Sequence, residues 1–144
     1  MRKLGLAGVV LLGVGVSGCA VMFSRRGLDH YVTRAVPQMA VRCGAFQRLP
    51  ARSIDLTADE QAGISECVDS ALASGRDFVY YVTGYTVDSR IAWGEFRRQG
   101  KVWAFWYDSA PCGTALCRER FEKWKCPSGQ AMTVQVSPCK RPGS

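Results

Sequence analysis

Cysteine is the residue type with the most chemistry in this chain, since seven of the 144 residues are cysteines. A thiol can form a disulfide, bind zinc or act as a nucleophile. The closest pair, Cys112 and Cys117, has a C-x4-C spacing, whereas structural zinc sites favour tighter knuckles. The only histidine, His30, lies far from this pair, which disfavours a histidine-activated thiol. We therefore expect no metal site and no cofactor.

Cys19 differs from the other cysteines because of the segment that precedes it. Two positive residues follow Met1, residues 4–16 are apolar and uncharged, and two small residues stand directly before Cys19. A positive start, a short apolar stretch and small residues at the cut are the layout of a secretory signal. The segment 1–18 is therefore predicted to be a signal peptide.

The four residues Val16-Ser17-Gly18-Cys19 resemble the lipobox of bacterial lipoproteins. The resemblance implies that the Cys19 thiol receives a diacylglyceryl group and that a peptidase cuts before Cys19. Fatty acids such as palmitate would then hold the chain to a membrane, since several acyl chains anchor stably where one does not. In enterobacterial lipoproteins an Asp after the cysteine retains the protein at the inner membrane, so Ala20 favours the periplasmic face of the outer membrane.

Two other interpretations of the N-terminus stay open. Residues 4–23 are uncharged and long enough to form an uncut transmembrane anchor. Five glycines would weaken such a helix, and Arg25 and Arg26 on its far side would nearly cancel the charge bias that orients it. The chain could also be a plainly secreted protein. All three interpretations place the remaining residues outside the cytoplasm.

The other cysteines are even in number, and an extracytoplasmic compartment is oxidising. Disulfides are therefore the leading interpretation. The spacing alone does not choose among the pairings. We expect Cys43 to pair with Cys67 and the rest to pair within the C-terminal region. The disulfide candidates are Cys43, Cys67, Cys112, Cys117, Cys126 and Cys139.

The acidic residues offer the main route to catalysis. The sequence contains no Gly-rich phosphate loop and no G-x-S-x-G motif, and its carboxylates are scattered. Glu66 and Asp69 share one face of a predicted helix, but that face is expected to be solvated. Carboxylates from separate elements could still meet, as glycoside cleavage requires. We therefore expect that the protein is not an enzyme and has no catalytic residues. The alternative is an enzyme that acts on the envelope or the cell wall.

Aromatic and basic residues concentrate between residues 80 and 107. Aromatic side chains and Arg dominate binding hot spots, although they also build cores. The net charge of +7 favours anionic partners. Anionic lipid or lipopolysaccharide is one such partner and an acidic envelope protein is another, whereas no nucleic-acid motif is present. The candidate partner-binding residues are Trp93, Trp103, Trp106, Tyr107, Arg97 and Arg98.

The clearest predicted element is a helix over residues 58–74. Thr57 and Glu60 fit a capping box, and apolar residues then recur at helical spacing. Aromatic and β-branched runs predict strands at 77–83, 91–98 and 101–107. Gln99-Gly100 suits a two-residue hairpin turn. These strands form a predicted antiparallel meander whose two faces are both largely apolar, so that either both are covered or one exposes aromatic rings.

The remaining segments are less distinctive. Residues 20–36 can form a short amphipathic helix or a tether, and residues 44–56 look irregular. A helix is predicted at 114–125 and a short strand at 131–136. Residues 141–144 are expected to form a flexible tail.

These observations predict an α+β fold: a small disulfide-stapled domain with a helix packed on an antiparallel β-meander. We expect a lipidated tether or helix at 19–42 and the envelope domain at 43–140. The expected function is that of a membrane-anchored envelope lipoprotein that binds a protein without catalysis. Such a protein could be an assembly factor, an inhibitor or an immunity protein.

Overall fold

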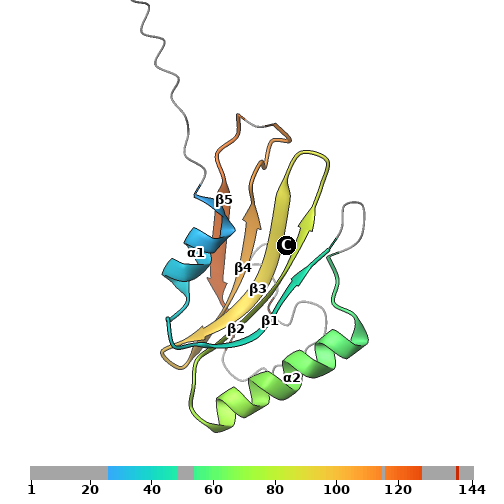
Figure 1. Ribbon diagram of the computed structural model, residues 1–144. Coiled ribbons are helices and arrows are strands. Elements are labelled where there is room, and N and C mark those ends of the chain that lie inside the picture. The colour runs from blue at the N-terminus through green and yellow to red at the C-terminus, as the bar shows by residue number, and fades with distance from the viewer. Residues whose placement is uncertain (1–25, 49–53, 115, 128–138, 140–144) are drawn as a thin grey trace, which may run out of the picture.

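The computed structural model describes residues 26–48, 54–114, 116–127 and 139. These residues form α1 (Gly27–Ala35), β1 (Val41–Gln47), α2 (Ala58–Ala73), β2 (Phe78–Tyr85), β3 (Arg90–Arg98), β4 (Lys101–Asp108) and β5 (Arg120–Lys125). The strands make one sheet in the order β1-β2-β3-β4-β5 (Figure 1). β1 runs parallel to β2, and the other neighbouring pairs are antiparallel. The predicted α+β class and the meander of β2, β3 and β4 are confirmed.

The helix α2 forms where its capping box predicts. The Thr57 hydroxyl accepts a hydrogen bond from the Glu60 amide at 3.3 Å, and the Glu60 carboxylate accepts one from the Thr57 amide at 2.8 Å. Both amides lack partners within the helix, so the box satisfies two orphan donors. Ile64, Val68 and Ala71 form the buried side of the helix.

The predicted turn between β3 and β4 is also present. Gln99 has φ 52° and Gly100 has φ 73°, so both central residues are left-handed. A two-residue turn with this geometry matches the right-handed twist of the strands that it joins. It sets Arg98 directly opposite Lys101 at the end of the hairpin.

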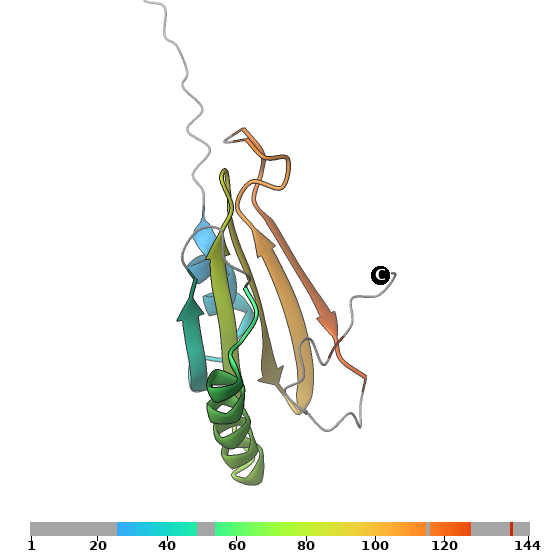
Figure 2. The same ribbon diagram turned by 90° about the vertical axis from the view of Figure 1, so that its right-hand side faces the viewer.

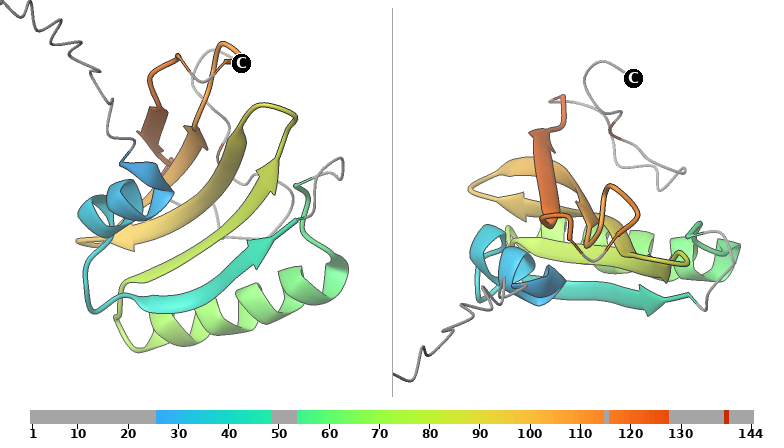
Figure 3. Two further views of the ribbon diagram at one scale, coloured as in Figure 1. Left: turned by 45° about the horizontal axis from the view of Figure 1, so that its top comes forward. Right: turned by 90° about the horizontal axis from the view of Figure 1, so that it is seen from above.

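Each face of the sheet is covered by a helix, which explains why its strands are apolar on both sides. α1 packs on a cluster that includes Val79, Phe96 and Phe105. α2 packs on the opposite face, against Phe78, Tyr80 and Val82. Figure 3 shows α2 lying along β1, on the other side of the sheet from α1. The sequence left open whether both faces are covered or one exposes aromatic rings. For the core residues, both faces are covered.

Two sequence predictions were wrong. Part of the segment expected to be irregular, residues 44–47, belongs to β1, and α2 is the crossover between the parallel strands β1 and β2. Residues 120–125, expected to be helical, form the edge strand β5. Phe121 and Trp124 fit one helical face, but pairing with β4 places them on opposite faces of the sheet. The predicted strand at 131–136 and the tail lie outside the described residues.

The predicted boundary at residue 43 falls inside the packed unit. α1 buries Leu28, Val32 and Ala35, and so residues 27–35 belong to the domain. The predicted short helix within residues 20–36 is thus present over part of its range. No helix in the described part of the chain is long and apolar enough to cross a membrane.

Three disulfides connect described cysteines. Cys43 pairs with Cys67, as expected, with their Cα atoms 5.4 Å apart. The register of β1 skips from Arg42 to Gly44, so Cys43 is an extra residue in a β-bulge, and its disulfide joins β1 to α2. The other bridges, also within the expected region, join Cys112 to Cys117 and Cys126 to Cys139.

Candidate functional site

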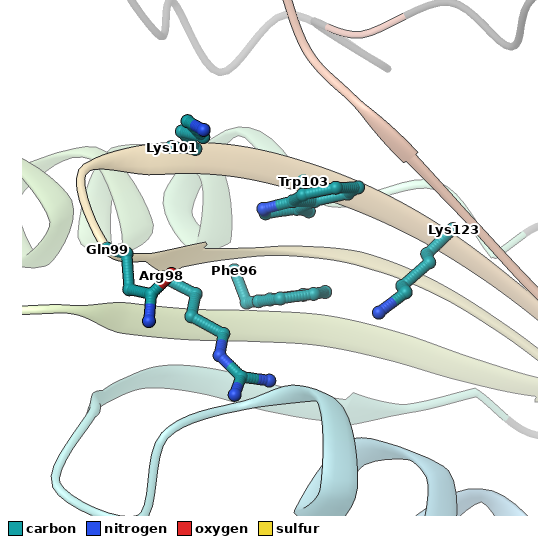
Figure 4. Close-up of a pocket in the computed structure, with 6 residues that line it drawn as sticks. All are labelled: Phe96, Arg98, Gln99, Lys101, Trp103 and Lys123. Carbon is teal, nitrogen blue, oxygen red and sulfur yellow. The ribbon is translucent and has the colours of Figure 1, made fainter.

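A hollow of about 240 Å³ opens on the α1 face of the sheet, at the end where β3 turns into β4. Figure 4 shows its lining side chains, which come from β3, β4, β5 and the turn between β3 and β4. They are Phe96, Arg98, Gln99, Lys101, Trp103 and Lys123. The hollow therefore combines aromatic surface with three cationic side chains.

Two of the cations are positioned by the hairpin. Arg98 and Lys101 are a directly opposed pair in the register of β3 and β4. The Arg98 guanidinium donates a hydrogen bond of 3.3 Å to the carbonyl of Ala35. Ala35 is the last residue of α1, and carbonyls at a helix C-terminus lack partners within the helix and attract cations. This contact ties the side chain of Arg98 to α1.

The aromatic part of the hollow comes from Phe96 and Trp103, which face each other in the register of β3 and β4. Phe96 is only 1% exposed and belongs to the core, whereas Trp103 is half-buried. The ammonium of Lys123 lies 5.4 Å from the centre of the Trp103 ring, within the range of a cation–π interaction. Trp103 thus presents a partly exposed aromatic ring with the ammonium of Lys123 beside it.

The chemistry of this arrangement is that of anion recognition. Within the described part of the chain, the residues lining the hollow include three cations and no carboxylate. Arg98, Lys101 and Lys123 are all exposed, so their charges act at the surface. A carboxylate or phosphate could meet these charges while an apolar group contacts Trp103.

Of the six residues predicted to bind a partner, only Trp103 and Arg98 line the hollow. Trp93 and Trp106 lie opposite each other on the α2 face, where the Trp93 indole donates a hydrogen bond of 3.1 Å to the Ile54 carbonyl. Tyr107, 2% exposed, is a core residue of the α1 face. Arg97 points to the α2 face and donates a hydrogen bond of 3.0 Å to the Arg76 carbonyl.

The hollow also contains residues that were not singled out from the sequence as binding residues. Lys123 was not expected beside Trp103, because the segment 114–125 was predicted to be a helix and not a strand next to β4. Phe96 was not predicted as a binding residue because it is a core residue, although it also lines the hollow. The signal that could have found them is period-two alternation, which places Phe121, Lys123 and Lys125 on one face of a strand.

A buried carboxyl group with a raised pKa lies beneath the α2 face and not in the hollow. Glu95 is 2% exposed, and burial raises its pKa to about 7. Its Oε2 accepts a hydrogen bond of 2.8 Å from the hydroxyl of Tyr80, itself 1% exposed. Burial and the neighbouring Glu95 raise the pKa of Tyr80 above its ordinary value. The burial of both groups favours a structural role for this pair.

Other carboxylates make structural contacts at the surface. Glu60 pairs with Arg48, and this contact lowers the pKa of Glu60 to about 2. Both oxygens of Glu119 accept hydrogen bonds from the amide of Gly27. Among the described residues, no group of three or more His, Cys, Asp or Glu side chains is placed to hold a metal ion.

Comparison of the chain with protein-family models, with curated proteins and with solved structures finds no match. The function is therefore inferred from the residues of this chain and their arrangement.

Proposed function

We propose that this protein is a bacterial envelope lipoprotein, anchored through acyl chains on Cys19, that binds an acidic protein partner without catalysing a reaction. The observation that carries the binding part is the hollow, which Arg98, Lys101 and Lys123 line together with the half-buried Trp103. Aromatic surface and adjacent charge form the kind of anchor point that dominates protein interfaces. Assembly factors, inhibitors and immunity proteins all act by such binding.

The lipobox-like segment Val16-Ser17-Gly18-Cys19 and the disulfides support placement in the envelope. Disulfides form and persist in oxidising compartments such as the bacterial periplasm. With Cys19 acylated, the other six cysteines all have partners among the described pairs.

The position of the hollow favours a protein partner over the lipids of the anchoring membrane. The chain enters α1 at Gly27, whereas the hollow lies beside the last residue of α1, Ala35. In Figure 1 the start of α1 and the turn between β3 and β4 lie at opposite ends of the domain. An anchor at Cys19 would therefore leave the hollow facing away from the bilayer.

Charge reversal in the hollow tests this proposal. The full-length protein would be isolated from envelope membranes with its bound partners, as wild type and as the double variant Lys101→Glu/Lys123→Glu. We expect the variant to lose an acidic partner that the wild type retains, and the wild-type complex to weaken as salt rises. The control is Arg42→Glu, which changes an exposed cation on β1, at the other edge of the sheet.

Equal recovery of the partner with the hollow variant and with wild type would contradict the proposal. So would equal loss with the hollow variant and with Arg42→Glu, because a general dependence on net charge would explain it. Recovery of anionic lipid or lipopolysaccharide in place of a protein would favour the other anionic partner.

A further inference from the structure

Two apolar side chains project from neighbouring loops at one end of the domain. Val87, in the turn between β2 and β3, is 99% exposed, and Leu116, in the connection between β4 and β5, is 91% exposed. The loops lie side by side, since a Cβ added to Gly113 would be 4.0 Å from the Asp88 carboxylate. Figure 2 shows both loops at the same end of the sheet.

The chain enters the domain at this same end. The amide of Gly27, the first residue of α1, donates hydrogen bonds of 3.0 and 3.2 Å to the two oxygens of Glu119. Glu119 directly precedes β5, so the start of α1 is fastened to the connection that carries Leu116. The point at which the chain enters α1 therefore lies at the end of the domain that carries both apolar tips.

The reach of the chain limits how far a lipid anchor can lie from this end. Cys19 precedes Gly27 by eight residues, which span at most roughly 28 Å when fully extended. This distance is comparable to the hydrocarbon thickness of one bilayer, about 30 Å. An acylated Cys19 would therefore keep Gly27, and the end of the domain that carries Val87 and Leu116, within reach of the membrane surface.

Both tips are held by local contacts. In the turn between β2 and β3, the Thr86 amide donates a hydrogen bond of 2.8 Å to the Ser89 carbonyl. In the other loop, the Cys112–Cys117 disulfide closes the segment that carries Leu116. Side chains held in an exposed position lose little further freedom when they are buried. The neighbouring Arg118 is exposed and could meet anionic head groups.

We infer that this end of the domain docks on the bilayer that carries the anchor, with Leu116 and Val87 entering the head-group region. The inference rests on the acylation of Cys19 proposed above. It fixes the orientation of the domain, with the loop end on the membrane and the cationic hollow facing the aqueous space. A second copy of the chain or another protein on these tips is the competing outcome.

Site-specific photocrosslinking to lipid tests the inference. Full-length protein, carrying a benzophenone amino acid at position 116, 87 or 39, would be reconstituted into vesicles of phosphatidylethanolamine and phosphatidylglycerol. Met39 is the matched control, because it is 90% exposed and lies two residues before β1, at the opposite end of the domain. We expect lipid adducts from positions 116 and 87 to exceed those from position 39 several-fold.

Flotation of the vesicles separates failure of the docking from failure of the anchor. Protein that floats but forms as few lipid adducts from 116 and 87 as from 39 would overturn the docking and leave the anchor standing. Adducts from positions 116 and 87 to protein and not to lipid would also overturn the docking and leave the anchor standing. Protein that does not float would overturn the anchor and the docking together. A second variant, Leu116→Asp, should float as wild type does and lower the lipid adducts from position 87.

Discussion

The hydroxyl of Tyr80 donates a hydrogen bond of 2.8 Å to Oε2 of Glu95, its direct neighbour across β2 and β3. Both side chains are buried under the α2 face, where the rings of Tyr80 and Trp93 make a T-shaped contact. A buried carboxyl group is costly when ionised, so its burial raises the pKa of Glu95 to about 7. The hydrogen bond from Tyr80 acts in the opposite direction and lowers it.

This pair makes the stability of the fold depend on pH. The pKa of Glu95 is raised from 4.5 to about 7 in the folded state, so between these values the folded chain binds more protons than the unfolded chain. The free energy of unfolding should therefore fall as pH rises from 5 to 8, with Glu95 contributing a loss of roughly 3 kcal/mol. Urea unfolding at a series of pH values measures the loss.

Two variants show whether Glu95 is responsible. Glu95→Gln keeps an oxygen that can accept the Tyr80 hydrogen bond but cannot ionise, so its free energy of unfolding should change less over this pH range. Tyr80→Phe removes the donor that lowers the pKa of Glu95, so the loss should still begin near the unfolded pKa but should extend to higher pH and become larger. The assignment fails if wild type and Glu95→Gln lose stability equally.

Gly94 is a position where a side chain cannot be accommodated. A Cβ at Gly94 would overlap the backbone carbonyl of Tyr80 and the Cβ of Tyr81, in the middle of the sheet. Gly94→Ala should destabilise the fold by about 1–3 kcal/mol or more, since backbone must shift to make room. Its control is Gly63→Ala, on the exposed side of α2, where the added Cβ has no atom within 4 Å apart from its chain neighbours and the backbone of the helix itself.

Gly63→Ala should instead raise the free energy of unfolding by roughly 0.5–1 kcal/mol, because Ala is the better helix former. Thermal unfolding of the two variants checks both signs. An unchanged free energy of unfolding for Gly94→Ala would contradict the close packing of the sheet around this position.

The Cys43–Cys67 bridge should contribute more stability than the Cys112–Cys117 bridge. The first joins residues 24 apart and fastens α2 to β1, whereas the second joins residues 5 apart within one connection. A bridge that closes a longer loop removes more entropy from the unfolded chain. Replacing both Cys43 and Cys67 by Ala should cost about 2–4 kcal/mol. Equal losses in urea unfolding for the two double variants would contradict this ranking.

The parts of the fold that could be predicted from the sequence are those fixed by local interactions. Thr57 and Glu60 specify the start of α2 through two mutual hydrogen bonds, and Gln99-Gly100 specifies a tight turn. β1 was missed because the bulge at Cys43 breaks the alternation that identifies a strand. β5 was missed because its hydrogen bonds to β4 come from a distant part of the chain and override a helical pattern.

The candidate site was predicted only in part, because some of its residues lie on expected strands and one lies on a strand that was missed. Trp103 and Arg98 lie on strands that were expected, and both line the hollow. Lys123 lies on the strand that was missed, so its place beside Trp103 was not predicted. The split of Arg97 and Arg98 between opposite faces follows from the register of the hairpin, which also separates Trp103 from Trp106.

Acylation of Cys19 outside the cytosol is the claim on which the anchor, the oxidising compartment and the orientation of the hollow all depend. Intact-mass measurement of the protein extracted from membranes, after alkylation of free thiols, tests it most directly. The predicted result is a chain that starts at Cys19, carries a diacylglyceryl group and fatty acid, and has no alkylated cysteine. A chain that still starts at Met1 with its thiols alkylated would contradict it.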